Sequence, residues 1–268
     1  MEVRAKKSLG QHFLTDQSIA KAIVDALGRS GDGCSDVLEV GPGMGVLTRY
    51  LLERDDISLK AVEIDSESVD YLLAHYPAIT GRIVLADFLK VSPEAFFKGD
   101  FRIIGNFPYN ISSQIFFKII DYRERIPEVV CMIQKEVAER IAEKPGSKTY
   151  GILSVFLQAW YDIEYLFTVG SGCFAPPPKV QSAVIRLRRS SRTSLGCDEA
   201  LFRTVVKTAF GQRRKTMRNS LRPLINKKAE REGWSAEKTA EFCAQSVFEL
   251  RPERLGVDDF VSLTLLLS

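Results

Sequence analysis

The tetrapeptide Asn106-Phe107-Pro108-Tyr109 combines residue types that could hold an aromatic amine. Such an amine is a poor nucleophile because its lone pair is delocalised into the ring, and its hydrogens need acceptors. The Asn106 side chain offers one carbonyl oxygen, and Pro108 biases Phe107 toward extended backbone, which directs the Phe107 carbonyl as a second acceptor. Tyr109 can stack on the ring of the amine. The tetrapeptide is therefore a candidate catalytic site that works mainly by positioning. A simple turn with Tyr109 in the core is the alternative.

A glycine-rich loop follows the apolar run Val37–Val40 and is a second candidate site. Gly41, Gly43 and Gly45 can adopt backbone conformations that are barred to other residues, and they let a ligand approach the backbone closely. The pattern predicts a buried strand, a tight turn and then a helix over residues 46–52. This order favours a site for a nucleotide-like cofactor, although the same glycine spacing also occurs in turns that bind nothing.

Acidic residues end the next two predicted strands. Glu63 lies 22 residues after Gly41, where a doubly wound sheet places the carboxylate that accepts hydrogen bonds from a ribose. Asp87 and Phe88 offer an acceptor beside an aromatic face, which suits an adenine. The spacing fits a dinucleotide and S-adenosylmethionine equally well, and a solvated loop acid remains the alternative for Asp87.

These residues need a parallel sheet that brings the ends of several strands to one edge. Apolar patterning predicts strands at residues 37–40, 59–65, 81–86, 101–105, 129–133, 163–169 and 182–187, with helices between them. Open α/β sheets bind ligands outside the carboxyl ends of their strands, so we expect Glu63, Asp87 and Asn106 to face one crevice. Residues 6–14 read as an arm over this crevice, followed by a helix that Thr15 or Asp16 caps.

From about residue 190 the pattern indicates helices only. They are expected at residues 198–210, 213–222, 237–245 and 257–267, and Asp198 is the expected cap of the first. In the second of these, Arg214, Arg218 and Arg222 recur at helical spacing on one face, where they would repel one another unless phosphates lie opposite. We therefore expect an α/β domain over residues 1–189 and a small all-α domain over 190–268 that binds a polyanion.

The net charge of +3 is unevenly distributed. Residues 182–231 hold 14 Lys or Arg against 3 Asp or Glu, whereas the rest of the chain is slightly acidic. A local excess of this size indicates a surface for a polyanion. A solvated helical surface is the alternative.

Composition bounds the remaining possibilities. With 268 residues, of which 45% are hydrophobic, the chain can bury the core of one full domain and a smaller one. No apolar run approaches the roughly 20 residues of a membrane span, and no signal peptide is recognisable. The 5 cysteines lack Cys-x-x-Cys spacing, which favours neither a disulfide framework nor a metal site. A reducing cytoplasm is expected.

Seven short segments match one family pattern. They are Lys-x-x-Gly-Gln-His-Phe-Leu (7–14), Glu-Val-Gly-Pro-Gly (39–43), Val-Glu-Ile-Asp (62–65), Ala-Asp-Phe (86–88), Asn-Phe-Pro-Tyr (106–109), Phe-x-Pro-Pro-Pro-Lys-Val-x-Ser (174–182) and Phe-x-x-Arg-Arg-Lys-Thr-Met-Arg-Asn (210–219). In combination, and over nearly the whole chain, they resemble the ribosomal small-subunit RNA adenine dimethyltransferases, whose loss in bacteria gives kasugamycin resistance.

The resemblance implies a fold, an activity and partners. The fold is a Rossmann-like S-adenosylmethionine-dependent methyltransferase sheet with helices on both faces, plus a small all-α C-terminal domain. The activity is methyl transfer to two adjacent adenosines in the 3′-terminal hairpin of 16S ribosomal RNA, which gives N(6),N(6)-dimethyladenosines. The expected partner is small-subunit RNA within a pre-ribosomal particle, and we expect a monomer that acts in small-subunit biogenesis.

Candidate site residues follow from the resemblance and from the patterns above. By position, the resemblance implies cofactor contacts from His12, Leu14, Gly41, Glu63, Asp87 and Asn106, to which we add Gly43 and Phe88. The candidate catalytic residues are Asn106, Phe107, Pro108, Tyr109 and Phe174, the last as the second face of a clamp on the base. The candidate RNA contacts are Lys6, Lys7, Lys179, Arg213, Arg214, Lys215, Arg218 and Arg222. Two positions depart from the family pattern, since His12 is often Asn and Phe107 is usually Leu.

Three other functions compete with this interpretation. A macrolide-resistance dimethylase of large-subunit RNA shares most of the motifs, but the basic segment at 210–219 favours the small-subunit enzyme. A non-catalytic RNA-binding or assembly factor on the same fold would not need the intact Asn106 and Tyr109. A nicotinamide dehydrogenase would require Gly-x-Gly-x-x-Gly and leaves Asn-Phe-Pro-Tyr unexplained.

Overall fold

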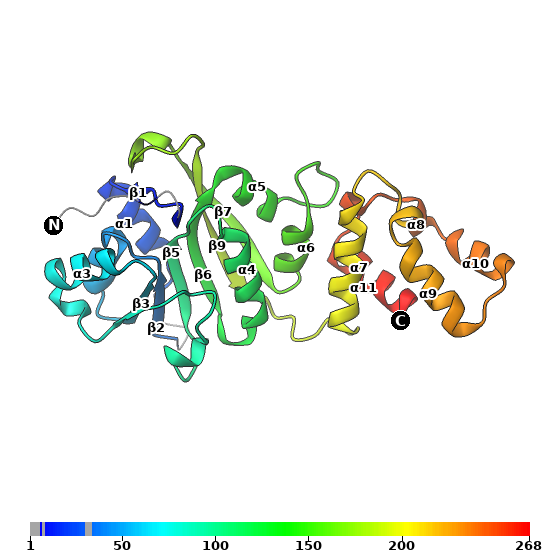
Figure 1. The fold of residues 1–268 in the computed structure, drawn as a ribbon, viewed down its shortest axis with the longest axis horizontal. Coiled ribbons are helices and arrows are strands. Elements are labelled where there is room, and N and C mark those ends of the chain that lie inside the picture. The colour runs from blue at the N-terminus through cyan, green and yellow to red at the C-terminus, as the bar shows by residue number, and fades with distance from the viewer. Residues whose placement is uncertain (1–5, 7–8, 30–33) are drawn as a thin grey trace. The chain divides into compact units, whose positions relative to one another are not determined.

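The structure is a computed structural model that describes residues 6, 9–29 and 34–268. The chain forms two compact units, residues 1–139 with 161–189 and residues 140–160 with 190–268 (Figure 1). One junction between the units follows Arg189, and residues 140–160 group with the C-terminal helices. The rings of Tyr150 and Phe156 lie 6.3 and 6.1 Å from those of Phe210 and Phe202 in the same unit.

The first unit is built on a seven-stranded sheet in the order β4-β3-β2-β5-β6-β9-β7. Its strands are β2 (Asp36–Val40), β3 (Ser58–Glu63), β4 (Ile83–Leu85), β5 (Arg102–Asn106), β6 (Glu128–Gln134), β7 (Tyr161–Val169) and β9 (Ser182–Arg189). The five strands β4, β3, β2, β5 and β6 are parallel to one another, whereas β9 is antiparallel to its neighbours β6 and β7. The strands predicted from sequence are confirmed, each within a few residues of its expected bounds.

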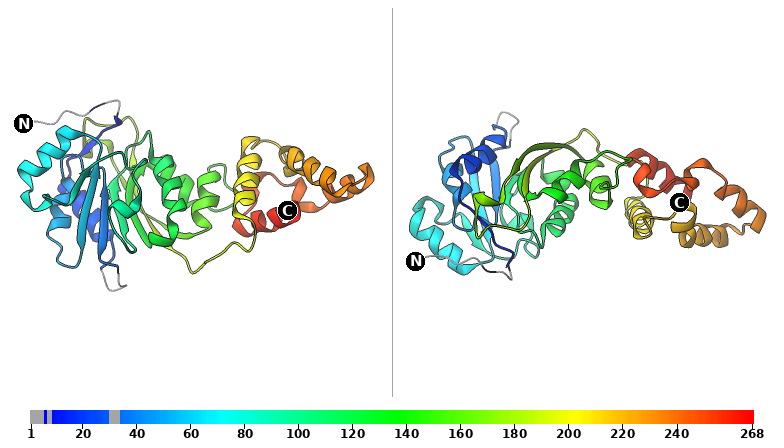
Figure 2. Two further views of the ribbon diagram at one scale, coloured as in Figure 1. Left: turned by 60° about the horizontal axis from the view of Figure 1, so that its bottom comes forward. Right: turned by 90° about the horizontal axis from the view of Figure 1, so that it is seen from above.

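Helices lie on both faces of this sheet (Figure 2). They are α1 (Gln17–Ala26), α2 (Val46–Leu52), α3 (Ser66–His75), α4 (Ser112–Asp121) and α5 (Lys135–Ala142). Because both faces are covered, β5 and β6 are buried except at their last residues, and the middle of β6 is a continuous apolar run rather than an alternating one. The predicted α/β class with a Rossmann-like sheet is confirmed.

A short second sheet joins the N-terminal arm to a distant segment. Strand β1 (Phe13–Leu14) pairs antiparallel with β8 (Phe174–Ala175). The arm then enters α1. The N-cap of α1 is Asp16, one of the two caps predicted, and its carboxylate accepts the backbone N–H groups of Ser18 and Ile19.

Arginines from three strands or loops hold the other end of α1. Arg54 donates to the carbonyl of Leu27 at 2.9 Å, Arg186 donates to that of Ala26 at 3.2 Å, and Arg102 donates to that of Gly28. The last carbonyls of a helix have no partner within it and carry partial negative charge, so these cations both satisfy and stabilise them. The helix that anchors the arm is thereby fixed to the sheet.

The second unit contains helices only, as predicted for the C-terminal part of the chain. They are α6 (Ile152–Gln158), α7 (Glu199–Gly211), α8 (Met217–Ser220), α9 (Arg222–Glu232), α10 (Ala236–Cys243) and α11 (Val257–Leu267), with short 3₁₀ turns between some of them. The predicted cap of α7 is confirmed, since the Asp198 carboxylate accepts the N–H of Leu201 at 2.7 Å. Among the helices of the described ranges, none has the length and apolarity that crossing a membrane requires.

The single helix predicted over residues 213–222 is wrong. Helix α7 ends at Gly211, α8 has only 4 residues, and α9 begins anew at Arg222. Pro223 has no backbone N–H and suits the first turn of a helix, so it favours a new helix start rather than continuation. At the start of α8, the N–H of Met217 donates at 2.8 Å to the carbonyl of Leu250 rather than to a carbonyl of the preceding residues. The three arginines at 214, 218 and 222 therefore do not share one helical face.

We expect Gly45→Ala to lower the free energy of unfolding more than Gly41→Ala does. Both glycines have positive φ, 79° and 70°, which costs an L-residue roughly 1–2 kcal/mol. A Cβ at position 45 would also lie 2.6 Å from the Tyr76 ring and 2.7 Å from Leu72, whereas one at position 41 meets nothing within 4 Å. Denaturant unfolding without added ligand measures both decreases. Equal decreases would contradict the steric argument.

Candidate active site

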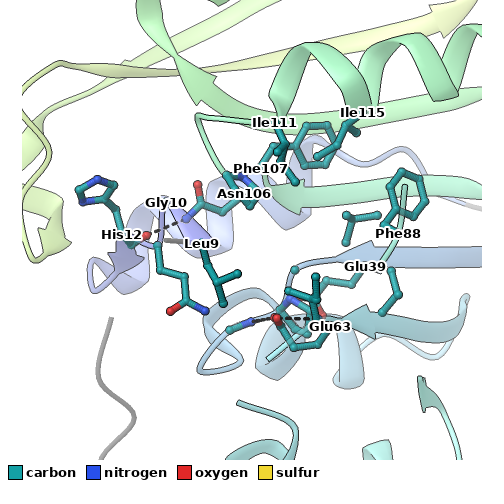
Figure 3. A pocket seen from close by; sticks show the side chains of 18 of the residues that line it. Leu9, Gly10, His12, Glu39, Glu63, Phe88, Asn106, Phe107, Ile111 and Ile115 are labelled. Carbon is teal, nitrogen blue, oxygen red and sulfur yellow. Dashed lines mark hydrogen bonds between the residues drawn. The ribbon is translucent and has the colours of Figure 1, made fainter. Parts of the chain in front are cut away.

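An open cavity of about 240 Å³ lies at the carboxyl ends of the parallel strands. Its walls come from the arm, the glycine loop, the ends of β3 and β5, and the turn after β4 (Figure 3). The structure thus brings Glu63, Asp87 and Asn106 to one crevice, as the strand pattern predicted. These residues come from three separate strand ends, and their meeting depends on the sheet order rather than on sequence proximity.

All eight candidate cofactor contacts line this cavity. They are His12, Leu14, Gly41, Gly43, Glu63, Asp87, Phe88 and Asn106. The candidate catalytic residues Asn106, Phe107, Pro108 and Tyr109 line it as well. The structure therefore places the glycine loop and the Asn-Phe-Pro-Tyr segment around a single space.

Glu63 fixes the glycine loop. Its side chain is buried, and one carboxylate oxygen accepts the N–H of Gly43 at 3.1 Å. The other oxygen accepts the N–H groups of Ile64 and Asp65, both at 2.9 Å. Burial raises the pKa of Glu63, and these three donors oppose that rise because they stabilise the ionised form. The carboxylate therefore shapes the cavity in addition to facing it.

Glu39 also lines the cavity, although it was not among the candidates predicted from the sequence. One carboxylate oxygen accepts the hydroxyl of Thr48 at 2.7 Å, while the other, Oε1, is buried with no hydrogen-bond partner among the described residues. Burial raises the pKa of Glu39 to about 8. The signal in the sequence was a single acid within the otherwise apolar run Val37–Val40, two residues before Gly41.

Asn106 is oriented by the arm. Its side-chain N–H donates to the main-chain carbonyl of His12 at 3.0 Å (Figure 3). With the amide nitrogen held in this way, the amide oxygen is the group that Asn106 can offer to a ligand as an acceptor. The neighbouring Phe107 is fully buried, and its N–H donates to the carbonyl of Met132 at 3.0 Å. The backbone at 106–107 is therefore tied to β6.

Tyr109 is held at both ends of its side chain. Its hydroxyl is hydrogen-bonded to Ser182 at 2.5 Å, and burial raises its pKa. The His12 ring stacks on the Tyr109 ring, with centroids 5.4 Å apart and planes inclined by 27°. The imidazole Nδ1–H of His12 also donates to the carbonyl of Pro176 at 2.9 Å. Tyr109 thus already has an aromatic neighbour on one face.

Phe174 does not join these residues. Its side chain is 4% exposed and belongs to the hydrophobic core cluster, and it is absent from the cavity wall. In the β1–β8 pair it lies opposite Leu14, another member of that cluster. The structure therefore does not support Phe174 as the second face of a clamp, because strand pairing turns its ring into the core.

Lys6, a candidate RNA contact, has a structural partner. Its ammonium lies 2.6 Å from the buried Asp65 carboxylate and 3.0 Å from Glu67. Burial would raise the pKa of Asp65, but hydrogen bonds from Lys6, then Gln11 and Ser68, bring it below its usual value. Lys6 therefore ties the arm to the turn before α3. Lys7 lies outside the described residues.

The other basic candidates differ in their surroundings. Lys179, Arg214, Lys215, Arg218 and Arg222 are exposed. Arg218 is nevertheless paired with Glu249, and the half-buried Arg213 donates to the carbonyl of Ser147 at 3.4 Å. The candidates with most freedom to meet a polyanion are therefore Lys179, Arg214, Lys215 and Arg222, of which Arg222 contacts only Asn219 at 3.2 Å among the hydrogen bonds described.

The fold and the site together define a Rossmann-like methyltransferase. The defining features are the sheet order, the glycine loop, the acid that ends β3, and the Asn-Phe-Pro-Tyr segment that faces them. A family model described as ribosomal RNA adenine dimethylase matches residues 2–239. The chain therefore belongs to the ribosomal RNA adenine dimethylase family, a family of enzymes.

Individual relatives agree with this membership. The chain is 55% identical over 264 residues to the ribosomal RNA small subunit methyltransferase A of Parabacteroides distasonis, covering 98% of this chain and 94% of the relative. It is 53% identical over 269 residues to the protein of the same name from Porphyromonas gingivalis, covering 100% and 99%.

Two solved structures are similar over nearly the full length of both chains. A dimethyladenosine transferase from Plasmodium falciparum superimposes with a TM-score of 0.75 at 25% identity, covering 96% of each chain. The 23S rRNA methyltransferase ErmE superimposes with a TM-score of 0.62 at 25% identity, covering 95% of this chain and 99% of that one.

We expect the stability of the wild type to fall with rising pH relative to a Glu39→Gln variant. Burial raises the pKa of Glu39 from 4.5 to about 8. Between pH 4.5 and pH 8 the folded protein therefore keeps a proton on Glu39 that the unfolded chain has already lost. The free energy of unfolding then decreases by up to ~1.4 kcal/mol per pH unit from this group. Glutamine keeps an acceptor for Thr48 but does not titrate. Denaturant unfolding across this pH window should show a growing advantage for the variant; a constant difference would mean that Glu39 is ionised when folded.

Proposed function

We propose that the protein transfers methyl groups from S-adenosylmethionine to the exocyclic amines of two adjacent adenosines in the 3′-terminal hairpin of 16S ribosomal RNA, giving N(6),N(6)-dimethyladenosines. The observation that carries the proposal is the orientation of Asn106. Its amide nitrogen is held by the His12 carbonyl, which leaves the amide oxygen as an acceptor at the cavity. Family membership supports methylation of adenine in ribosomal RNA.

The charge of the cavity supports this methyl donor. Glu39, Glu63 and Asp87 line the cavity, and its described lining contains no lysine or arginine. S-adenosylmethionine carries a sulfonium and an ammonium cation, and the unpartnered Glu39 oxygen suits a cationic donor. A nicotinamide dinucleotide carries two phosphates, and the described lining offers no lysine or arginine to pair with them. The residues present therefore fit S-adenosylmethionine and disfavour the dehydrogenase alternative.

The chain's own residues would act by positioning. When bound, the cofactor supplies an electrophilic methyl group. Asn106 and the carbonyl of Phe107 would accept the hydrogens of the adenine amine, which directs its lone pair, while Tyr109 would stack on the base. Fixed acceptors of this kind need no reorganisation during the reaction. Glu63 would hold the ribose of the donor, and Phe88 with Asp87 its adenine.

Small-subunit RNA is favoured over large-subunit RNA as the substrate. The relatives named small subunit methyltransferase A are 53–55% identical to this chain, whereas the 23S rRNA methyltransferase ErmE is 25% identical. An amine inside a stacked helix is out of reach of the methyl group, so the target adenosine must be unstacked. We further propose that the enzyme acts as a monomer on a pre-ribosomal particle in the cytoplasm.

The decisive experiment measures transfer of labelled methyl groups to unmodified small subunits, to large subunits and to DNA. We expect label on the small-subunit RNA alone, as dimethyladenosine at two adjacent positions. Label on large subunits would favour the macrolide-resistance activity instead. Specific binding to small subunits without any transfer would favour an assembly factor.

Two variants should separate cofactor binding from catalysis. Glu63→Ala removes charged hydrogen bonds and should weaken S-adenosylmethionine binding by roughly 1.5–3 kcal/mol. Asn106→Ala should abolish transfer while small subunits still bind, because the basic surface is untouched. Calorimetry, subunit binding and turnover are measured on both variants. Full turnover by Asn106→Ala would exclude the proposed mechanism, and unchanged affinity in Glu63→Ala would remove Glu63 from the cofactor site.

Replacing Arg214, Lys215 and Arg222 by Gln should weaken binding to any RNA. Each phosphate that the protein no longer neutralises flattens the logarithmic salt dependence by about 0.7, so three phosphates correspond to ~2 units. As a control, Gln replaces the exposed Arg29, Arg82 and Lys98, which removes the same three positive charges from the first unit. Binding isotherms against salt should distinguish the two variants. Equal slopes would show that these residues are a solvated surface.

A further inference from the structure

His12 contacts both groups that the proposed function assigns to the target base. Its imidazole stacks on Tyr109, and its main-chain carbonyl accepts the hydrogen bond of Asn106. The ring is also anchored from the other side, since its Nδ1–H donates to the carbonyl of Pro176 at 2.9 Å. The side chain of His12 therefore contacts Tyr109 and Pro176, whereas its main chain binds Asn106.

The stack leaves no room for a base between the two rings. Aromatic rings in direct contact have centroids about 4.5–7 Å apart, and those of His12 and Tyr109 are 5.4 Å apart. A third ring cannot enter at this separation. A base that stacks on this face of Tyr109 must occupy the place where the imidazole now lies.

We propose that the His12 imidazole is a place-holder for the target adenine. It covers the stacking face of Tyr109 in the free protein and leaves when the base enters. This inference rests on the proposed function, which supplies the adenine. Leaving requires rotation of the side chain only, because the main-chain carbonyl does not move when the Cα–Cβ bond turns. Asn106 therefore stays oriented while the imidazole gives up its contacts to Tyr109 and Pro176.

The place-holder makes base binding an exchange. The adenine gains a stack on Tyr109, and the protein gives up the stack of His12 together with its hydrogen bond to Pro176. An aromatic pair is worth about 0.5–1.5 kcal/mol beyond its buried area. The more strongly the side chain at position 12 is held by Tyr109 and Pro176, the weaker the net affinity for the extruded base should be.

Two variants test this relation. His12→Ala removes the ring and its hydrogen bond to Pro176, and His12→Phe keeps a ring but loses that hydrogen bond. We expect the dissociation constant for unmodified small subunits, measured with S-adenosylhomocysteine bound, to increase in the order Ala, Phe, wild type. Each step should be roughly two- to tenfold, the worth of one aromatic pair or one hydrogen bond. Because His12 also lines the cofactor cavity, the affinity of each variant for S-adenosylhomocysteine is measured first, and subunit binding is then compared at saturating S-adenosylhomocysteine.

The other outcomes overturn the inference. The reverse order would show that the imidazole stacks on the bound base and so assists it. Equal dissociation constants in all three proteins would show that the ring has a structural role only. Wild-type protein that transfers no methyl group to small subunits would instead be a failure of the proposed function.

A second measurement needs no RNA. The chain has only two histidines, His12 and His75, so the imidazole signals in a proton–carbon NMR spectrum of the full-length protein are readily assigned. The ring of His75 stacks on Tyr71 at 3.9 Å, which provides a matched control. Tyr109→Leu should move the His12 signals and not those of His75, and Tyr71→Leu should do the opposite. Unmoved His12 signals in Tyr109→Leu would overturn the stack and with it the place-holder.

Discussion

A buried carboxylate at the end of β3 holds the cavity together. Glu63 accepts one N–H from the glycine loop and two from the turn that begins α3, so a single side chain fixes two loops that are far apart in sequence. Burial alone favours the neutral acid, but hydrogen bonds from backbone N–H groups to the ionised form are strong. The acid is thus more than a ligand contact, because the walls of the cavity take their shape from it.

The acidity of the cavity has a cost that a cationic ligand can offset. Glu39 and Glu63 are both buried, and the charge on Glu63 helps to raise the pKa of Glu39. A donor with a sulfonium and an ammonium group would favour the ionised forms. The product of such a donor would carry a neutral thioether in place of the sulfonium. The same carboxylates would therefore attract the product less than the donor, which would assist exchange between the two.

Local patterns predicted the fold well, and long-range contacts explain where they failed. The caps at Asp16 and Asp198 and the apolar strands depend on neighbouring residues, and they are found where expected. The start of α8 involves a hydrogen bond from the N–H of Met217 to the carbonyl of Leu250. The burial of Phe174 depends on its pairing with Leu14. Neither partner can be identified from the spacing of residues around the position itself. Glu39 was overlooked because it lies within the run Val37–Val40, which is otherwise apolar and was interpreted as a buried strand.

The arm shows why one position can vary in its side chain and still keep its role. Orientation of Asn106 needs only a main-chain carbonyl at position 12, which any residue can supply. The side chain at that position faces a different neighbour, the ring of Tyr109. The two contacts are therefore independent. A different side chain at position 12 could therefore change how the Tyr109 face is covered without disturbing the orientation of Asn106.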